Sequence, residues 1–275
     1  AIGKKIAISC AERLKPVILE LGGKDPMIVL KDANIERAVS AALWGGFSNA
    51  GQTCLSVERL YVEESVFEDF KEKLSQGIDK LTIGPNKEDD IGPISTQANY
   101  DKVIRQINEA REKGTSIIES DLNMKKGWFI PPTVILHPSI KLEVCQTETF
   151  GPVITLYSFK KLNETINTIN EIGYGLGASI FGRDKKRINE TIEKLRCGAI
   201  SINDINTYYG ITDLPFGGVG LSGIGRVHGR DGLRAFSIQK SVTKNKITLN
   251  SEPWWFNDYK KLKNILKKTL KWLYG

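Results

Sequence analysis

Strand-like apolar runs alternate with helix-patterned segments over nearly two hundred residues, and this rhythm constrains the fold more than any other feature. Residues 27–30 form a buried-strand pattern. The following segment then places apolar residues at helical spacing, namely Ile35, Ala38, Val39, Ala42 and Leu43. Residues 198–203 continue the alternation. Such a rhythm predicts an α/β fold with a largely parallel sheet and flanking helices, and Asp32 is placed to cap the helix after the first of these strands.

The composition is that of an ordinary globular protein. Hydrophobic residues make up 40% of the 275 positions and charged residues 26%, and no apolar run approaches the roughly 18 residues that cross a bilayer. Much of the net charge of +7 is concentrated in the last twenty residues, so we expect no nucleic-acid partner. The four scattered cysteines (Cys10, Cys54, Cys145 and Cys197) favour neither a zinc site nor a disulfide scaffold, and they indicate a reducing, cytoplasmic location.

Cys54 is the first candidate for chemistry, in the stretch Gly51-Gln52-Thr53-Cys54-Leu55-Ser56. It lies between a helix-patterned segment and a strand, where small neighbours leave room for a small molecule. A helix end or an electropositive pocket would lower the pKa of the thiol and favour the reactive thiolate. Taken alone, however, a lone cysteine is more often a small core residue.

Glu20 is the second candidate, 34 positions earlier, in Leu19-Glu20-Leu21-Gly22-Gly23-Lys24. Residues 15–19 have the pattern of an apolar strand, and the two glycines then permit a turn with positive φ. A carboxylate at the carboxyl end of a strand lies where α/β sheets place their ligands, although a solvated strand-end glutamate is the plain alternative. Together, the thiol and the carboxylate suggest a nucleophile with its base.

The two stretches resemble the active-site signatures of the NAD(P)-dependent aldehyde dehydrogenase superfamily. Residues 148–153 (Glu-Thr-Phe-Gly-Pro-Val) resemble the family's cofactor-ribose segment. Residues 215–218 and 222–226 resemble its C-terminal glycine-rich signature. The four motifs occur in the family's order, and the resemblance extends from residue 1 to about residue 246.

The resemblance implies oxidation of an aldehyde to a carboxylic acid with NAD or NADP as hydride acceptor. Cys54 would add to the aldehyde, loss of hydride would leave a thioester, and Glu20 would activate the water that hydrolyses it. Glu148 would accept hydrogen bonds from the nicotinamide-ribose hydroxyls, with Phe150 packed beside the ring; outside the motif, Glu148 is a plain surface carboxylate. Lys24 is expected to be a structural partner and not a catalyst.

Ile205, Tyr208 and Tyr209 precede the Pro215 motif, where the family lines its substrate tunnel. These side chains would favour an apolar or aromatic aldehyde. Anchoring of a surface loop explains the same residues equally well.

The resemblance also divides the chain. The predicted parts are a remnant of the dinucleotide-binding domain (1–21), the catalytic domain (22–225), a return segment with an oligomerisation strand (226–250) and a basic amphipathic tail (251–275). The chain starts inside a helix pattern without an initiator methionine, which suggests that most of the cofactor domain is missing. We therefore expect a polypeptide of this length to be inactive in aldehyde oxidation by itself, and its full-length relatives to be homo-oligomers.

Three other functions fit parts of the sequence. Cys54 paired with His137 or His228 would make a thiol hydrolase, although neither histidine has the flanking sequence of one. The thiol and the base alone would make an esterase-like remnant. A non-catalytic protein could instead pair with intact dehydrogenase subunits through the strand-like segment 236–242.

The last twenty-five residues differ from the rest. Trp254, Trp255 and Phe256 precede a helix pattern with one apolar stripe, made of Leu262, Ile265, Leu266, Leu270 and Leu273. Six lysines occupy the other faces. A basic amphipathic helix of this kind predicts peripheral contact with an anionic membrane surface; the alternative is docking against its own domain or a sister subunit.

Overall fold

The computed structural model describes residues 2–121, 126–246, 250–252, 255–256 and 258–275. Contacts divide the chain into two compact units, residues 1–237 and residues 238–275, and each is described by itself. Of the predictions above, the one that involves Trp254 falls outside the described residues.

The larger unit is built on a seven-stranded sheet in the order β4-β5-β6-β3-β2-β8-β9. Among its described strands, β4 at one edge is antiparallel to β5, and the other neighbours are parallel. The strands are β2 (Asp25–Val29), β3 (Val57–Glu63), β4 (Ile117–Glu119), β5 (Thr133–Leu136), β6 (Val153–Phe159), β8 (Gly177–Phe181) and β9 (Ala199–Ile202). The predicted α/β fold with a largely parallel sheet is confirmed.

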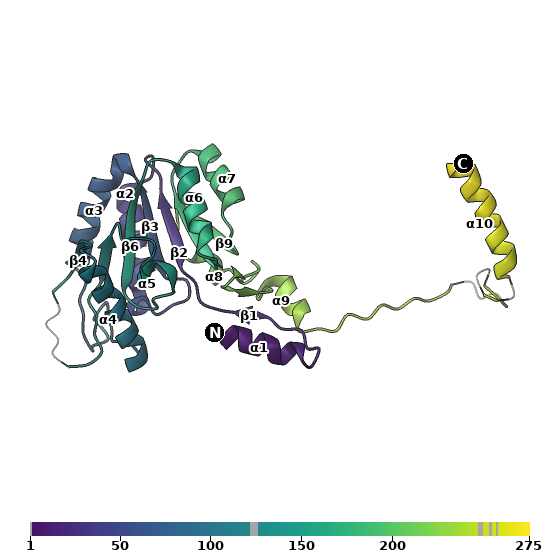
Figure 1. Cartoon of the computed structure of the whole chain (residues 1–275), viewed down its shortest axis with the longest axis horizontal. Helices are drawn as coiled ribbons and strands as arrows, with labels where there is room; N and C mark the ends of the chain where they lie inside the picture. Colours follow the sequence, from purple (N-terminus) through teal and green to yellow (C-terminus); the bar gives the residue numbers. More distant parts are fainter. Residues whose placement is uncertain (1, 122–125, 247–249, 253–254, 257) are drawn as a thin grey trace. The chain divides into compact units, whose positions relative to one another are not determined.

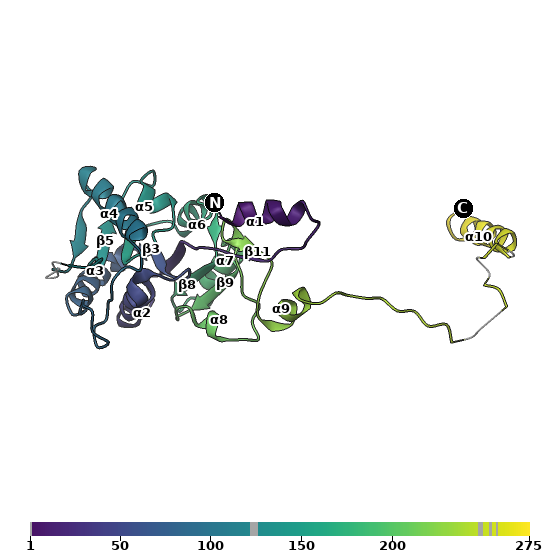
Figure 2. The same ribbon diagram turned by 90° about the horizontal axis from the view of Figure 1, so that it is seen from below.

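Helices cover both faces of this sheet (Figures 1 and 2). One face packs against α2 (Ile35–Phe47), α3 (Glu64–Ile78) and α4 (Gln97–Glu112), and the other against α6 (Leu162–Glu171) and α7 (Lys185–Lys194). The shorter helices and the first one are α1 (Ile2–Ala11), η1 (Ser48–Gly51), α5 (Glu143–Gln146), α8 (Thr207–Gly210) and α9 (Gly229–Ala235).

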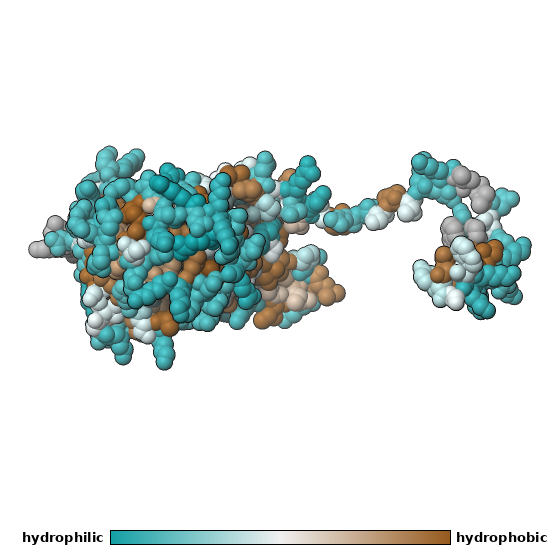
Figure 3. All heavy atoms as spheres, turned by 90° about the horizontal axis from the view of Figure 1, so that it is seen from above, coloured by the Kyte–Doolittle hydropathy of each residue, from teal (hydrophilic) through white to brown (hydrophobic). Residues whose placement is uncertain are grey.

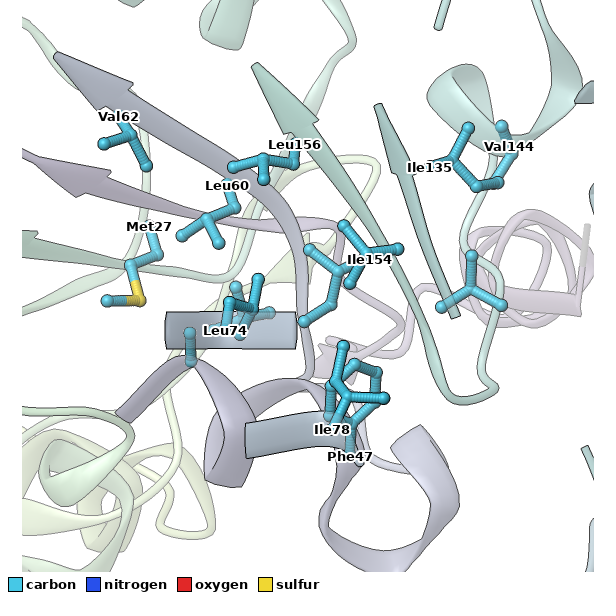
Figure 4. Close-up of a cluster of buried hydrophobic side chains, with 14 of the residues drawn as sticks. Met27, Phe47, Leu60, Val62, Leu74, Ile78, Ile135, Val144, Ile154 and Leu156 are labelled. Atoms are coloured by element: carbon cyan, nitrogen blue, oxygen red, sulfur yellow. The ribbon is translucent and has the colours of Figure 1, made fainter. Parts of the chain in front are cut away.

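Residues 27–30, which begin within strand β2, are apolar without interruption because helices cover both faces of the sheet. Met27 and Val29 belong to the core beneath α2, α3 and α4, whereas Ile28 and Leu30 belong to the core beneath α6 and α7. Successive strand residues point to opposite faces, so a strand covered on both sides has no polar face. Figure 4 shows the first core, where Met27 belongs to the same cluster as Leu74 of α3.

The cap of α2 differs from the prediction. Asn34 caps the helix, because its side-chain oxygen accepts the backbone N–H of Arg37 at 3.1 Å. Asp32 instead accepts the backbone N–H groups of Arg183 and Asp184, at 3.0 and 2.7 Å. Its carboxylate therefore fixes the turn after β8, a long-range role that the local sequence did not indicate.

Two short antiparallel ribbons accompany the sheet. Strand β1 (Leu19–Glu20) pairs with β11 (Gly223–Ile224), and β7 (Tyr174–Gly175) pairs with β10 (Val219–Gly220). The predicted strand over residues 15–19 is therefore wrong except at Leu19. Pro16 has no N–H to donate to a strand ladder, which helps to explain why pairing starts so late.

The smaller unit contains helix α10 (Tyr259–Tyr274), none of whose residues is buried. Residues 238–242 belong to no strand in this single chain, so their pairing with another subunit stays a prediction. Among the described residues, no helix is both long enough and apolar enough to span a membrane.

We expect Leu74→Ala to lower the free energy of unfolding by about 2–5 kcal/mol, because it leaves a cavity beneath a fully buried helix face. Leu233→Ala makes the same change at a side chain that is 77% exposed and serves as the matched control. Urea unfolding of both variants measures the difference. Equal midpoints for the two would contradict the assignment of this core.

Candidate active site

The predicted site residues lie where parallel strands begin. Cys54 comes shortly before β3, the Gly22-Gly23 turn shortly before β2, and Phe150 shortly before β6. Because these strands run in the same direction, their entry loops meet at the end of the sheet where the strands begin. We call this end the amino-terminal edge. The expectation that Glu20 occupies the carboxyl end of a sheet strand is wrong: Glu20 lies in the β1–β11 ribbon, just ahead of this edge.

A left-handed turn ends the helical segment before Cys54. Three consecutive residues have positive φ: Asn49 (51°), Ala50 (54°) and Gly51 (67°). A Cβ atom on Gly51 would lie 2.1 Å from the carbonyl oxygen of Gly151, so only glycine fits there. Gln52 braces the turn, since its side chain donates to the carbonyls of Asn49 and Pro93 and accepts from the amide of Ser95.

A buried ion pair joins the entry loop of β2 to the start of β3. Lys24 Nζ lies 2.5 Å from Glu58 Oε2, and both side chains are almost fully buried. The Glu58 carboxylate also accepts the backbone N–H groups of Thr149 at 2.9 Å and Phe150 at 3.0 Å. Buried charges are tolerated only when paired and hydrogen-bonded, and here both conditions hold. The geometry agrees with the structural role expected of Lys24.

Gly22 and Gly23 lie between Glu148 and Cys54. A Cβ atom on Gly22 would fall 2.2–2.4 Å from the atoms of the Glu148 carboxyl group, and one on Gly23 would fall 2.4 Å from the carbonyl oxygen of Cys54. Glu148 Oε1 accepts the N–H of Gly23 at 3.1 Å. The two glycines therefore permit the close approach that brings three sequence motifs into one site.

The fourth motif, the C-terminal glycine-rich signature, lies close to Glu20 and so belongs to the same site. This side chain is exposed, yet partial desolvation raises the pKa of its carboxyl, and the Arg226 guanidinium and the Gly218 amide offset part of that rise. After burial, the charge of Glu20 is the largest influence on the Cys54 thiol. Glu20 and Cys54 therefore belong to one electrostatic environment.

That environment is acidic. Burial raises the pKa of Cys54 most, and the carboxylates of Glu20, Asp25 and Glu148 raise it further, to about 11. An electropositive pocket would lower this pKa, but the charged groups that act on this thiol are acidic. At neutral pH the resting group is the thiol, so its reaction needs a base to accept the proton.

An apolar wall adjoins the half-buried Cys54. It is formed by the cluster of Leu55, Leu176, Tyr208 and Phe216. Tyr208 is anchored beneath the site, since its hydroxyl lies 3.4 Å from the buried Asp25 carboxylate. Asp25 also accepts the N–H of Gly177 at 3.0 Å, and burial raises its pKa to about 7. The sequence did not single out Asp25, because its partners lie more than 150 positions away.

Glu148 is suited to hold the ribose of a nicotinamide nucleotide. Its Oε1 is used by Gly23, whereas no donor within the described residues bonds to Oε2. A ribose hydroxyl donates a hydrogen bond, so the free carboxylate oxygen fits that group. Phe150 is half-buried, with a φ of 55°, in the loop that carries Glu148.

Neither histidine supports a thiol hydrolase. His137 follows the carboxyl end of β5, at the opposite edge of the sheet from Cys54, and packs against Phe67. His228 packs against Tyr209 and Phe216, and no hydrogen bond to Cys54 is present among the described residues. Over the same residues, no group of three side chains could hold a metal ion.

The family model described as "Aldehyde dehydrogenase family" matches residues 1–242. The chain belongs to the aldehyde dehydrogenase family. It is 38% identical over 254 residues to a 4,4'-diapolycopene aldehyde oxidase of a Methylomonas species, and covers 48% of that protein. It is 34% identical over 262 residues to chloroplastic betaine aldehyde dehydrogenase of Atriplex hortensis, and covers 51% of it. These alignments include 92% and 93% of this chain.

A solved structure gives the same picture of an aldehyde dehydrogenase fold. Betaine aldehyde dehydrogenase from Staphylococcus aureus, determined in complex with NAD+, superposes with a TM-score of 0.83 at 31% identity. The superposition covers 93% of this chain and 51% of that one. The chain thus spans about half the length of the curated relatives that it matches.

We expect Lys24→Met to destabilise the fold by about 3–5 kcal/mol, because it leaves the Glu58 carboxylate buried without its cation. Lys161→Met removes an exposed ion pair with Glu164 and is expected to have no measurable effect. Thermal and urea unfolding measure both. A Lys24→Met variant as stable as the parent would contradict the structural role of the pair.

We expect Glu20→Gln to lower the pKa of Cys54, because it removes the negative charge that acts most strongly on the thiolate. Alkylation of the Cys54 peptide by iodoacetamide, followed by mass spectrometry against pH, should become severalfold faster near pH 8. Glu68→Gln, an exposed change on α3, is the control. If the pH midpoint of Cys54 alkylation in Glu20→Gln were unchanged or higher, this would contradict the proximity of the Glu20 carboxylate to the Cys54 thiol.

Proposed function

We propose that this aldehyde dehydrogenase family member carries out acyl chemistry at Cys54, with Glu20 as general base, in the oxidation of an aldehyde to a carboxylic acid. The convergence of Glu20, Cys54 and Glu148 at one edge of the sheet, from three separate motifs, carries the proposal. The two residues proposed to bond to the substrate carbon and to activate water, Cys54 and Glu20, both belong to this chain.

In the first step, the Cys54 Sγ bonds to the aldehyde carbon and the thiol gives up its proton. The raised pKa of the thiol means that a base must take that proton. Glu20 is suited to do so, because desolvation raises the pKa of its carboxyl and makes it a stronger base than a free glutamate. As the carbonyl π bond opens, Glu20 returns this proton to the aldehyde oxygen, so the product is a neutral thiohemiacetal on Cys54 and Glu20 is ionised again.

A bound NAD or NADP would supply the hydride acceptor that converts the thiohemiacetal to a thioester. Glu148 would hold its ribose through Oε2, and Phe150 is proposed to lie beside the ring. In the last step, Glu20 takes a proton from water as the water oxygen bonds to the thioester carbon. The carbon–sulfur bond then breaks and Glu20 gives its proton to the leaving sulfur, which restores the Cys54 thiol and releases the acid.

The substrate is proposed to be an aldehyde with an apolar chain. The names of the relatives point to different aldehydes, among them betaine aldehyde and diapolycopene aldehyde, and so do not select one. The wall beside Cys54, in contrast, is apolar and aromatic, with Leu176, Tyr208 and Phe216 in contact. An apolar chain would lose its water contacts there at little cost to the wall.

A homo-oligomer in the cytoplasm is the proposed setting. Phe236, Ile238 and Val242 are 80–96% exposed, and these apolar side chains suit an edge strand that pairs with another subunit. The boundary between the two compact units, after residue 237, falls within the proposed oligomerisation segment 226–250. We also propose domain boundaries between residues 21 and 22 and between residues 250 and 251.

We expect the chain to release a burst of nitrophenol from nitrophenyl acetate, because acylation of Cys54 needs no hydride acceptor. Cys54→Ser should abolish the burst, and the intact mass should show one acetyl group on Cys54 in the parent. Cys197→Ser, a change at a second partly buried cysteine, should keep the burst.

The Glu20→Gln variant tests whether Glu20 acts as the general base. Its burst should be slower, because Glu20 no longer takes the thiol proton, but should keep its full amplitude, because hydrolysis of the acetylated Cys54 slows by about a hundredfold or more, the usual contribution of a general base. Hydrolysis at the parental rate would remove Glu20 from the proposed mechanism. A burst that survives in Cys54→Ser would remove the nucleophile itself.

A further inference from the structure

Helix α10 carries a concentrated positive charge. Between Tyr259 and Tyr274 it contains six lysines and no acidic residue. Asp258 precedes the helix and lies 4.0 Å from Lys261. The family match ends at residue 242, so this charge lies outside the part of the chain that the family model describes.

The lysines and the apolar residues occupy separate faces. With about 100° between successive helical residues, five aliphatic side chains fall within an arc of about 140°. These residues are Leu262, Ile265, Leu266, Leu270 and Leu273. The six lysines fall within the opposite arc of about 160°, and Lys261 and Lys263 flank the apolar arc on its two sides. The helix is thus divided almost in half.

Among the described residues of this unit, Leu262 is the one member of the apolar arc that is partly buried, and the other four are exposed. Leu266, Leu270 and Leu273 are each more than half exposed, and Trp272, at one margin of the arc, is 83% exposed. Figure 3 shows hydrophobic and hydrophilic side chains together at the surface of this unit. The helix is not long and apolar enough to span a bilayer.

We propose that α10 lies flat on an anionic membrane surface, with its leucine face in the acyl boundary and its lysines among the lipid headgroups. A half-and-half division of the helix matches a planar interface between an apolar and an aqueous phase. The flanking Lys261 and Lys263 can extend their apolar stems along the boundary while their ammonium groups reach the headgroups. Trp272, at the margin of the arc, is a side chain that favours this depth.

The positive charge of α10 determines which kind of membrane surface it would bind. A helix with six cations and no anion is attracted to acidic lipids and gains nothing comparable from zwitterionic ones. An apolar groove on a protein would use the same leucines, but it would not depend on lipid. Membrane contact would also hold the chain close to aldehydes that partition into the bilayer, in keeping with the apolar wall beside Cys54.

Vesicle flotation of the full chain tests the proposal. We expect binding to phosphatidylcholine vesicles that contain phosphatidylglycerol to exceed binding to phosphatidylcholine alone by about tenfold or more, and to weaken as salt is raised. The double change Leu266→Gln with Leu270→Gln keeps the charge and a helix-forming side chain, and should abolish flotation. Asn264→Gln, on the lysine face, is the matched control and should float like the parent.

Three results would overturn the proposal: no flotation with acidic vesicles, equal flotation with both vesicle types, or full flotation of the double leucine variant. The first would leave docking to a protein as the use of this helix. The nitrophenol burst of every variant should match the parent, so failure here is independent of the chemistry proposed for Cys54.

Discussion

The buried Lys24–Glu58 ion pair is the interaction on which the site depends. It places a cation from the entry loop of β2 against a carboxylate at the start of β3, and that carboxylate binds the amides of the loop that enters β6. Three neighbouring parallel strands are thereby fixed at the end where they begin. Cys54, Glu148 and Phe150 lie on these entry loops, so their positions follow from this junction.

Carboxylates at this edge satisfy the backbone N–H groups of loops that enter strands. Glu58 accepts the N–H groups of Thr149 and Phe150. In the same way, Glu148 accepts the N–H of Gly23, and Asp25 accepts the N–H of Gly177. The arrangement stabilises the loops, but it also surrounds Cys54 with negative charge. Burial of the thiol and this negative charge together raise its pKa, so the proposed chemistry requires a nearby base.

The features that could be predicted from the sequence are those that depend on local residue patterns. Alternating strand and helix periodicities predicted the layered fold, and four motifs identified Glu20, Cys54 and Glu148. Partners distant in the chain were out of reach of that reasoning. Glu20 appeared to end a sheet strand because its pairing with Gly223 is about two hundred residues away. The raised pKa of Cys54 depends first on burial and then on the carboxylates of Glu20, Asp25 and Glu148, and both come from packing that no local spacing reveals.

The most direct measurement is a crystal structure of the Glu20→Gln chain after reaction with nitrophenyl acetate, since slow hydrolysis would preserve the acyl group. The account predicts an acetyl group on Cys54 Sγ, with the side chain of residue 20 facing the thioester carbon across one water molecule. An acetyl group on another residue, or a side chain at position 20 directed away from the thioester, would contradict it.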